Sequence, residues 1–187
     1  MTTATERKLM TAEELLKAPK VDGRRFELIR GVLIEKMPAG KSQGVPGSRI
    51  DGILFNYADT NDYGVTVSCE TGYRLEFDPD TVRAPDVAWF APGRLPEDVV
   101  GFPEIVPDLA VEIKSPSNSW PEITEKAYMW LCYGSQQTWV ADAVTATITI
   151  FHLNTAPVTL AEGDVLDGGD LLPGFSTPVW RLFRRRR

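Results

Sequence analysis

The run Leu109–Lys114, with the sequence Leu-Ala-Val-Glu-Ile-Lys, constrains the fold of this chain more than any other segment. Its β-branched and apolar residues are typical of a buried strand. Side chains alternate between the two faces of a strand, so Val111 and Ile113 point one way and Glu112 and Lys114 the other. Ionised side chains are rarely placed among apolar neighbours unless they are paired, bind a metal or act in chemistry.

The residues that follow predict how this strand is connected. Ser119 and Glu122 have the spacing of a capping box and start a helix at about 120–132. The next apolar run, Thr138–Ala141, is typical of another strand. A helix between two strands is a crossover, which favours parallel pairing. We therefore expect an α/β fold with a mixed β-sheet flanked by helices.

The remaining elements complete the predicted fold. A capping box of Thr11 and Glu14 starts a short N-terminal helix, and a β-hairpin follows it; these two elements precede the sheet. We expect one domain over 1–187, with 1–10 and 184–187 flexible. The further predictions are strands at 25–30 and 32–36, a loop at 40–47, a helix at 48–60, a hairpin of 65–69 with 73–77, a strand from Val87, and strands at 145–153 and 158–161.

The net charge of -6 argues mildly against a general nucleic-acid binder, because phosphate contacts need local positive charge. The four arginines at 184–187 are read as a solvated end of the chain. Cys69 and Cys132 lie in apolar runs, so both are expected to be reduced core residues. With His152 as the single histidine, neither a histidine-rich zinc site nor a Ser-His-Asp triad is expected. No segment resembles a signal peptide or a membrane span, so a cytoplasmic protein is expected.

Two carboxylates suggest the chemistry. Asp86 opens the apolar run 87–90, and it can converge with Glu112 if the two strands are neighbours. Two carboxylates suit a hard cation such as Mg²⁺, and Lys114 would stabilise developing negative charge, which together could hydrolyse a phosphodiester. The alternative is that Glu112 and Lys114 form a solvated edge or a structural ion pair.

The chain also resembles a known family, through segments whose order and spacing are more specific than any one of them. The resemblance is to the Uma-two family of endonucleases, within the PD-(D/E)xK restriction-endonuclease-like superfamily, and it runs from about Thr11 to Phe183. The matching segments are 26–31, 71–75, 82–88, 107–112, 115–117, 125–126, 138–142, 168–170 and 172–175.

This resemblance implies a metal-dependent deoxyribonuclease that uses Mg²⁺ or Mn²⁺ on a DNA substrate. Asp86 and Glu112 match the metal-binding acids, and the backbone carbonyl of Ile113 is expected as a further ligand. Lys114 matches the superfamily lysine. Lys126 matches a helix lysine of many Uma-type sequences, so which lysine acts stays open, with Lys114 preferred. The alternative role of Lys126 is a surface pair with Glu122.

Two further positions bear on activity. Glu27 matches another family acid expected near the metal site, and its alternative is a solvent-facing residue of the hairpin. Many similar sequences carry a histidine before the first long helix, where this chain has Gln43. Glutamine cannot act as a titrating base near neutral pH.

Two other functions are therefore considered. One is an inactive nucleic-acid- or protein-binding module on the same fold. The other is a structural domain in which the charged strand face is a subunit contact. The strand 146–152, Trp139 and Trp180 are candidates for a homodimer contact, although core packing would explain them equally well.

Overall fold

The structure is a computed structural model that describes residues 9–18, 24–38, 40–68 and 71–183. The chain divides into two compact units, each built from separate stretches of sequence. Unit 1 comprises Met1–Pro38, Gly72–Ala84 and Asp98–Ile105, and unit 2 comprises Ala39–Thr71, Pro85–Glu97 and Val106–Arg187. The single domain expected from the sequence stays a prediction, and the flexible ends at 1–8 and 184–187 lie outside the described residues.

Unit 2 contains a six-stranded mixed sheet with the order β10-β9-β8-β7-β6-β3. The predicted crossover is confirmed, because β7 and β8 are parallel and α3 connects them, whereas the other neighbours are antiparallel. The strands are β3 (Val65–Val67), β6 (Val87–Phe90), β7 (Leu109–Lys114), β8 (Gln137–Asp142), β9 (Thr147–His152) and β10 (Thr155–Leu160). The helices are α2 (Lys41–Asn61), α3 (Trp120–Cys132) and α4 (Trp180–Phe183), and a separate pair of strands comprises β11 (Val165–Asp167) and β12 (Ser176–Pro178).

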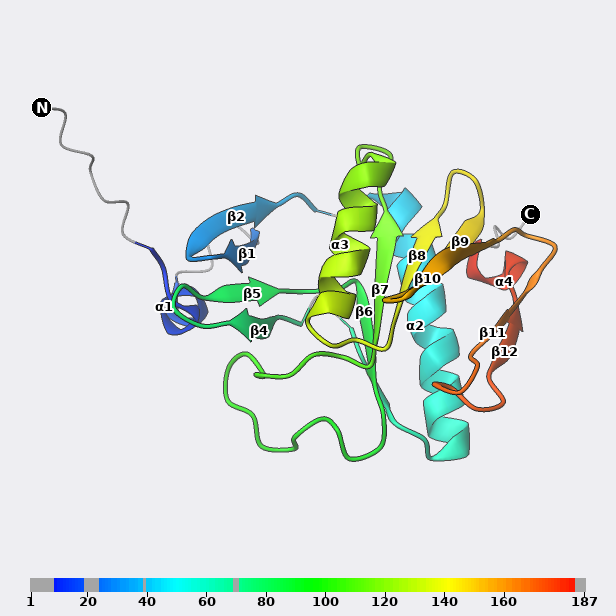
Figure 1. The fold of residues 1–187 in the computed structure, drawn as a ribbon, viewed down its shortest axis with the longest axis horizontal. Coiled ribbons are helices and arrows are strands. Elements are labelled where there is room, and N and C mark those ends of the chain that lie inside the picture. Colours follow the sequence, from blue (N-terminus) through cyan, green and yellow to red (C-terminus); the bar gives the residue numbers. More distant parts are fainter. Residues whose placement is uncertain (1–8, 19–23, 39, 69–70, 184–187) are drawn as a thin grey trace, which may run out of the picture. The chain divides into compact units, whose positions relative to one another are not determined.

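Helices α2 and α3 lie on opposite faces of this sheet (Figure 1). Val111, Ile113 and Trp139 pack in a cluster with residues of α2 and α4. Val140 packs in another cluster with residues of α3. The alternation predicted for β7 is therefore present, and Glu112 faces α3. The capping box of Ser119 and Glu122 begins α3 as predicted.

Helix α2 begins at Lys41, so the predicted loop at 40–47 was wrong. Gly44, Pro46 and Gly47 are typical of a loop, and proline removes a helical hydrogen bond. Tertiary packing outweighs this local preference, because Pro46 is buried. A Cβ at Gly47 would lie 3.7 Å from Ile113 Cγ1, so this glycine lies close to β7.

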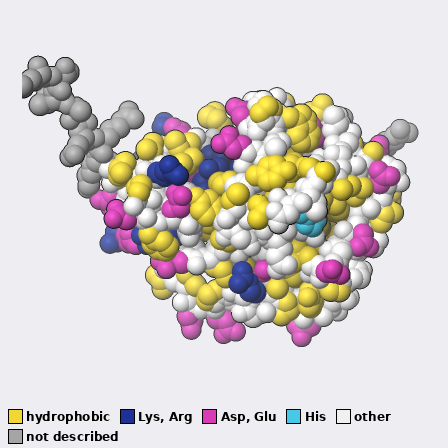
Figure 2. Space-filling model, in the orientation of Figure 1, with side chains coloured by type: hydrophobic (Ala, Val, Ile, Leu, Met, Phe, Trp, Pro, Cys, Tyr) yellow, Lys and Arg dark blue, Asp and Glu magenta, His cyan; other side chains and the backbone are white. Residues whose placement is uncertain are grey.

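The chain's only histidine, His152, lines a cavity of about 430 Å³ in unit 2 together with Gln137 and Asp170. Histidine atoms are visible at the surface in Figure 2. Gln137 is the first residue of β8 and pairs with Leu109, the first residue of β7. The cavity therefore lies at the end of these parallel strands away from Glu112 and Lys114.

Unit 1 contains α1 (Ala12–Lys17) and a four-stranded antiparallel sheet with the order β2-β1-β5-β4. Its strands are β1 (Arg25–Ile29), β2 (Val32–Lys36), β4 (Tyr73–Glu76) and β5 (Thr81–Arg83). The capping box of Thr11 and Glu14 and the β1–β2 hairpin are confirmed. The predicted hairpin of 65–69 with 73–77 was wrong, since β3 pairs with β6 and β4 pairs with β5, a strand that the sequence did not predict.

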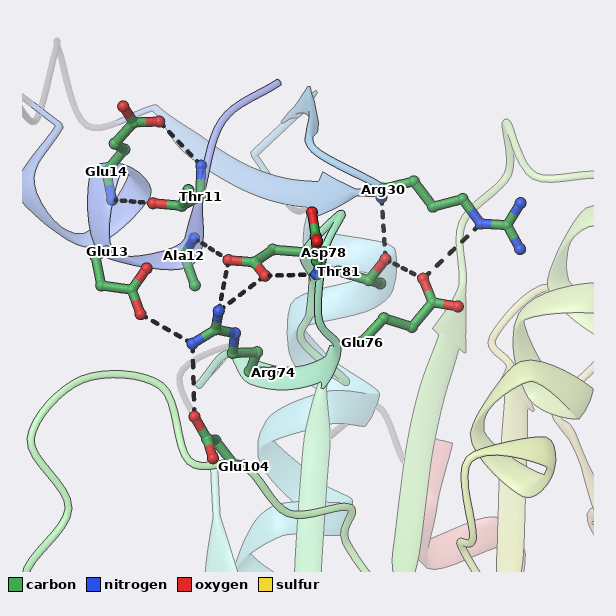
Figure 3. A network of polar contacts seen from close by, with 11 residues as sticks. Thr11, Ala12, Glu13, Glu14, Arg30, Arg74, Glu76, Asp78, Thr81 and Glu104 are labelled. Atoms are coloured by element: carbon green, nitrogen blue, oxygen red, sulfur yellow. Dashed lines mark hydrogen bonds and ion pairs between the residues drawn. The ribbon is translucent and has the colours of Figure 1, made fainter. Parts of the chain in front are cut away.

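A polar network joins α1 to β4 within unit 1 (Figure 3). The Arg74 guanidinium binds both carboxylate oxygens of Asp80, at 2.8 and 2.9 Å, and contacts Glu13 and Glu104. Asp80 in turn accepts a hydrogen bond of 2.6 Å from the backbone N–H of Ala12. Burial acts to raise the pKa of Asp80, but the hydrogen bonds from the Ala12 N–H and the Arg74 guanidinium outweigh it and hold this pKa below its usual value. The network therefore attaches the start of α1 to the sheet.

One prediction about an individual side chain was wrong. Cys132, the last residue of α3, is exposed rather than in the core, because the helix buries a different face. The strand predicted at 145–153 forms β9, which lies inside the sheet, and Trp139 is fully buried, so core packing accounts for these two candidates, and a homodimer stays a prediction. Cys69 lies outside the described residues. None of the described helices is both long and apolar enough to span a bilayer.

Candidate active site

Asp86 immediately precedes β6 and is attached to the neighbouring strand β7 by two hydrogen bonds. Its Oδ2 accepts a bond of 2.6 Å from the backbone N–H of Ile113. Its own N–H donates to the carbonyl of Val111 at 3.1 Å. These bonds hold Asp86 beside the backbone on both sides of Glu112, so the predicted convergence of the two carboxylates occurs. No partner for Asp86 Oδ1 is found among the described residues.

Glu112 has a different hydrogen-bond partner on each carboxylate oxygen, and only 1% of the residue is exposed. The Lys126 ammonium lies 2.7 Å from Oε2. The indole N–H of Trp130 donates to Oε1, also at 2.7 Å. Lys126 and Trp130 are four residues apart on α3, and residues at this spacing lie on the same helix face. Trp130 was not among the site residues predicted from the sequence, although its spacing relative to Lys126 was visible there.

Burial dominates the electrostatics of Glu112. Loss of water raises its pKa, and the nearby Asp86 carboxylate raises it further, whereas Lys126 and the hydrogen bond from Trp130 lower it. The result is a pKa of about 7, above the usual value of 4.5. The group therefore changes charge close to neutral pH when no metal is bound.

Lys114 also projects from the α3 side of β7, but its ion pair is with another acid. Its Nζ lies 3.6 Å from Asp142 Oδ2, and these two residues are register partners on the parallel strands β7 and β8. The ammonium also lies 5.8 Å from the centre of the Trp120 ring. The structure thus pairs Lys126 with the Glu112 carboxylate and Lys114 with Asp142.

Gln43, in the first turn of α2, reaches the same place. Its Nε2 donates to the carbonyl oxygen of Ile113 at 3.4 Å. This is the carbonyl expected as a metal ligand, so the position at which the resemblance led us to expect a histidine adjoins the candidate site. An amide can donate to this oxygen, but it cannot take up a proton near neutral pH.

Glu27 belongs to unit 1 and is only 3% exposed, so it is not the solvent-facing residue considered as its alternative. Its Oε2 lies 2.9 Å from Arg83 Nε and 3.4 Å from Lys36 Nζ. Its Oε1 accepts a hydrogen bond of 3.4 Å from the backbone N–H of Ala84. Glu27 therefore holds the chain two residues before Asp86.

The donors around Asp86 and Glu112 suit a hard cation. The two carboxylates and the Ile113 carbonyl are all oxygen ligands, which Mg²⁺ prefers. In the part of the chain that the structure describes, no three His, Cys, Asp or Glu side chains form a metal-binding group. Mg²⁺ in proteins commonly has one or two carboxylates and keeps several waters, so two carboxylates are enough for this ion.

Comparisons with known proteins identify the family to which the chain belongs. The Uma2 family model, described as "Putative restriction endonuclease", matches residues 12–180. The chain belongs to the Uma2 family. This confirms the resemblance stated from the sequence, and membership of Uma2 supports a nuclease function. A search among curated proteins finds no match.

The Uma2 chain is also similar to a crystal structure from Anabaena variabilis ATCC 29413, described as a putative nuclease belonging to DUF820. The TM-score is 0.79, with 93% of this chain and 97% of that chain covered. At 20% sequence identity, this similarity concerns the fold. It confirms the predicted α/β architecture, a mixed sheet flanked by helices.

Proposed function

We propose that this Uma2 protein is a metal-dependent endonuclease that hydrolyses phosphodiester bonds in DNA with Mg²⁺ or Mn²⁺. The observation that carries the proposal is the arrangement around β7. There, Ile113 N–H holds one carboxylate, Asp86, beside a second carboxylate, Glu112, which is paired with a lysine. Glu112 is buried beside a lysine, an arrangement that is costly for stability alone and therefore favours a role in chemistry.

Each residue has a role in this proposal. Asp86, Glu112 and the carbonyl of Ile113 would hold the metal. When bound, the metal would lower the pKa of a water molecule and offset charge on the phosphate. Asp86 is fixed by the backbone, so it would keep its orientation throughout. Lys126 would then place its positive charge beside the phosphate, where negative charge develops in the transition state.

We assign this role to Lys126 in preference to Lys114. Lys126 already lies 2.7 Å from a candidate metal ligand, whereas Lys114 lies 3.6 Å from Asp142. Lys126 would leave Glu112 Oε2 when a cation replaces it there. Lys114 would keep its pair with Asp142 and stabilise the ends of β7 and β8.

Glu27 would contribute indirectly. Its hydrogen bond to the Ala84 N–H holds the backbone two residues before Asp86. Replacing Glu27 by glutamine removes the charge that Arg83 and Lys36 neutralise, so we expect weaker cleavage rather than complete loss.

Cleavage of supercoiled plasmid and of single-stranded DNA with Mg²⁺ or Mn²⁺ tests the proposal. Wild type is expected to cut, and Glu112→Gln to lose activity. Lys126→Met should reduce the rate at saturating substrate by about 100-fold or more, and Lys114→Met by much less. A Lys114→Met loss equal to that of Lys126→Met would refute the assignment of the lysine. Unchanged cleavage by Glu112→Gln would refute the site.

A binding module without turnover is the second candidate, and Gln43 is the observation that favours it. If a titrating side chain beside the Ile113 carbonyl is needed for cleavage, Gln43 cannot supply it. This candidate predicts that wild type binds DNA without cutting it and that Gln43→His produces metal-dependent cleavage. Cleavage by wild type would exclude this candidate.

A further inference from the structure

The two carboxylate oxygens of Glu112 accept hydrogen bonds from side chains that differ in flexibility and in exposure to solvent. Trp130 is completely buried, and its indole has one N–H donor on a rigid ring. Lys126 has a flexible side chain with three donors, and 16% of that side chain is exposed. Both hydrogen bonds are 2.7 Å long. One partner is therefore fixed in the core, whereas the other can move toward solvent.

We infer that Trp130 is a positioning residue for Glu112, and that it determines which carboxylate oxygen is available to a metal. Its indole N–H keeps Oε1 directed toward the buried Trp130 ring, so Oε2, the oxygen that Lys126 can leave, is the metal-binding atom. Glu112 would then bind through one oxygen. This inference rests on the proposed metal site, but it concerns the orientation of a ligand and not the reaction.

Core packing alone does not explain this contact. A phenylalanine would fill most of the same space without a polar atom, whereas Trp130 gives its one donor to the buried carboxylate of the candidate site. Hydrogen bonds that orient a metal ligand commonly affect metal affinity by 10- to 100-fold when they are removed. A loss of metal affinity of that size would distinguish a positioning role for Trp130 from a role in packing alone.

Trp139 offers a matched control in the same unit. It is also completely buried, and its indole N–H also donates to a side-chain oxygen, that of Gln137, at 3.0 Å. However, Trp139 belongs to the cluster on the α2 face of the sheet, and Glu112 faces α3. Trp139→Phe should therefore cost similar packing and hydrogen bonding without touching Glu112.

The test is calorimetric titration of wild type, Trp130→Phe and Trp139→Phe with Mg²⁺, beside urea unfolding of each protein. We expect Trp130→Phe to raise the Kd at least 10-fold and Trp139→Phe to change it less than 2-fold. Equal Kd values for Trp130→Phe and wild type would overturn the inference, as would equal increases in both variants.

The indole ¹H–¹⁵N resonance of Trp130 in the wild-type fold gives a second readout. We expect it to shift in Glu112→Gln, and to remain typical of a hydrogen-bonded indole when Mg²⁺ is bound. A resonance typical of a free indole in the Mg²⁺ complex would overturn the inference even if Trp130→Phe does not fold. Wild type that binds no Mg²⁺ would refute this inference together with the metal site. Mg²⁺ binding weakened only by Trp130→Phe, without DNA cleavage, would support the positioning role and refute the nuclease.

Discussion

Replacing Glu112 by glutamine should change how the stability of the protein depends on pH. Burial raises the pKa of Glu112 to about 7, from its usual value of 4.5. Between these values the folded protein keeps a proton that the unfolded chain has released. The free energy of unfolding therefore falls as pH rises through this window, and the loss is complete above about pH 7.

The size of this effect follows from the gap between the two pKa values. Each tenfold difference in proton affinity corresponds to about 1.4 kcal/mol, so the gap corresponds to about 3 kcal/mol. Glutamine has nearly the same shape and can still accept the bond from Trp130, but it does not titrate. Relative to wild type, the free energy of unfolding of Glu112→Gln should rise by about 3 kcal/mol between about pH 4 and pH 8.

Urea unfolding of the two proteins across this pH range, with a chelator present, measures the difference. Other titrating groups are common to both proteins, so their contributions largely cancel. Two stability profiles that stay parallel from pH 4 to pH 8 would show that the pKa of Glu112 is not raised in the folded protein. A difference that falls with increasing pH would show that Lys126, and not burial, dominates the environment of Glu112.

Two further predictions concern the scaffold. Gly64 has φ +79°, and an added Cβ would lie 2.3 Å from the Phe90 carbonyl oxygen. Gly64→Ala should therefore lower the free energy of unfolding by about 3 kcal/mol and the Tm by about 10 °C. Gly93 has φ +72°, but an added Cβ would meet no atom within 4 Å in the described structure. Gly93→Ala should therefore lower the free energy of unfolding by only about 1 kcal/mol. Equal losses of Tm in Gly64→Ala and Gly93→Ala would contradict the clash at Gly64. Arg74→Met leaves the buried Asp80 without its cation and should lower the free energy of unfolding by about 2 kcal/mol. This loss is smaller than for a fully buried ion pair, because 17% of the Arg74 side chain is exposed. Hydrogen exchange should locate that loss in α1 and β4, and unchanged protection there would contradict the network.

The sequence was most informative where local signals and packing agree. The apolar run of β7, the capping box at Ser119 and the following strand specified a parallel crossover, and all three elements are present. Asp86 and Glu112 were recognised as converging carboxylates for the same reason, since their strands were identified from strong apolar runs. The pairing of β6 with β7 then brings them together.

The other parts of the fold could not be predicted from local sequence, mainly because they depend on strand pairing between distant segments. The strands at 65–67 and 73–76 are close in sequence and resembled a hairpin, but their partners come from later in the chain. Pro46 and its neighbouring glycines obscured the start of α2, because burial, which local sequence does not report, stabilises that turn. The hydrogen bond from Trp130 to Glu112 depends on how α3 is rotated against the sheet, which the spacing of Lys126 and Trp130 alone does not determine.

The most direct test of the central claim is nicking of supercoiled plasmid in Mg²⁺ by wild type and by Asp86→Asn. Asparagine can still accept the hydrogen bond from the Ile113 N–H, so the fold should survive and circular dichroism should be unchanged. We expect cleavage by wild type and its loss in Asp86→Asn. Equal cleavage by the two folded proteins would contradict a metal site at Asp86 and Glu112.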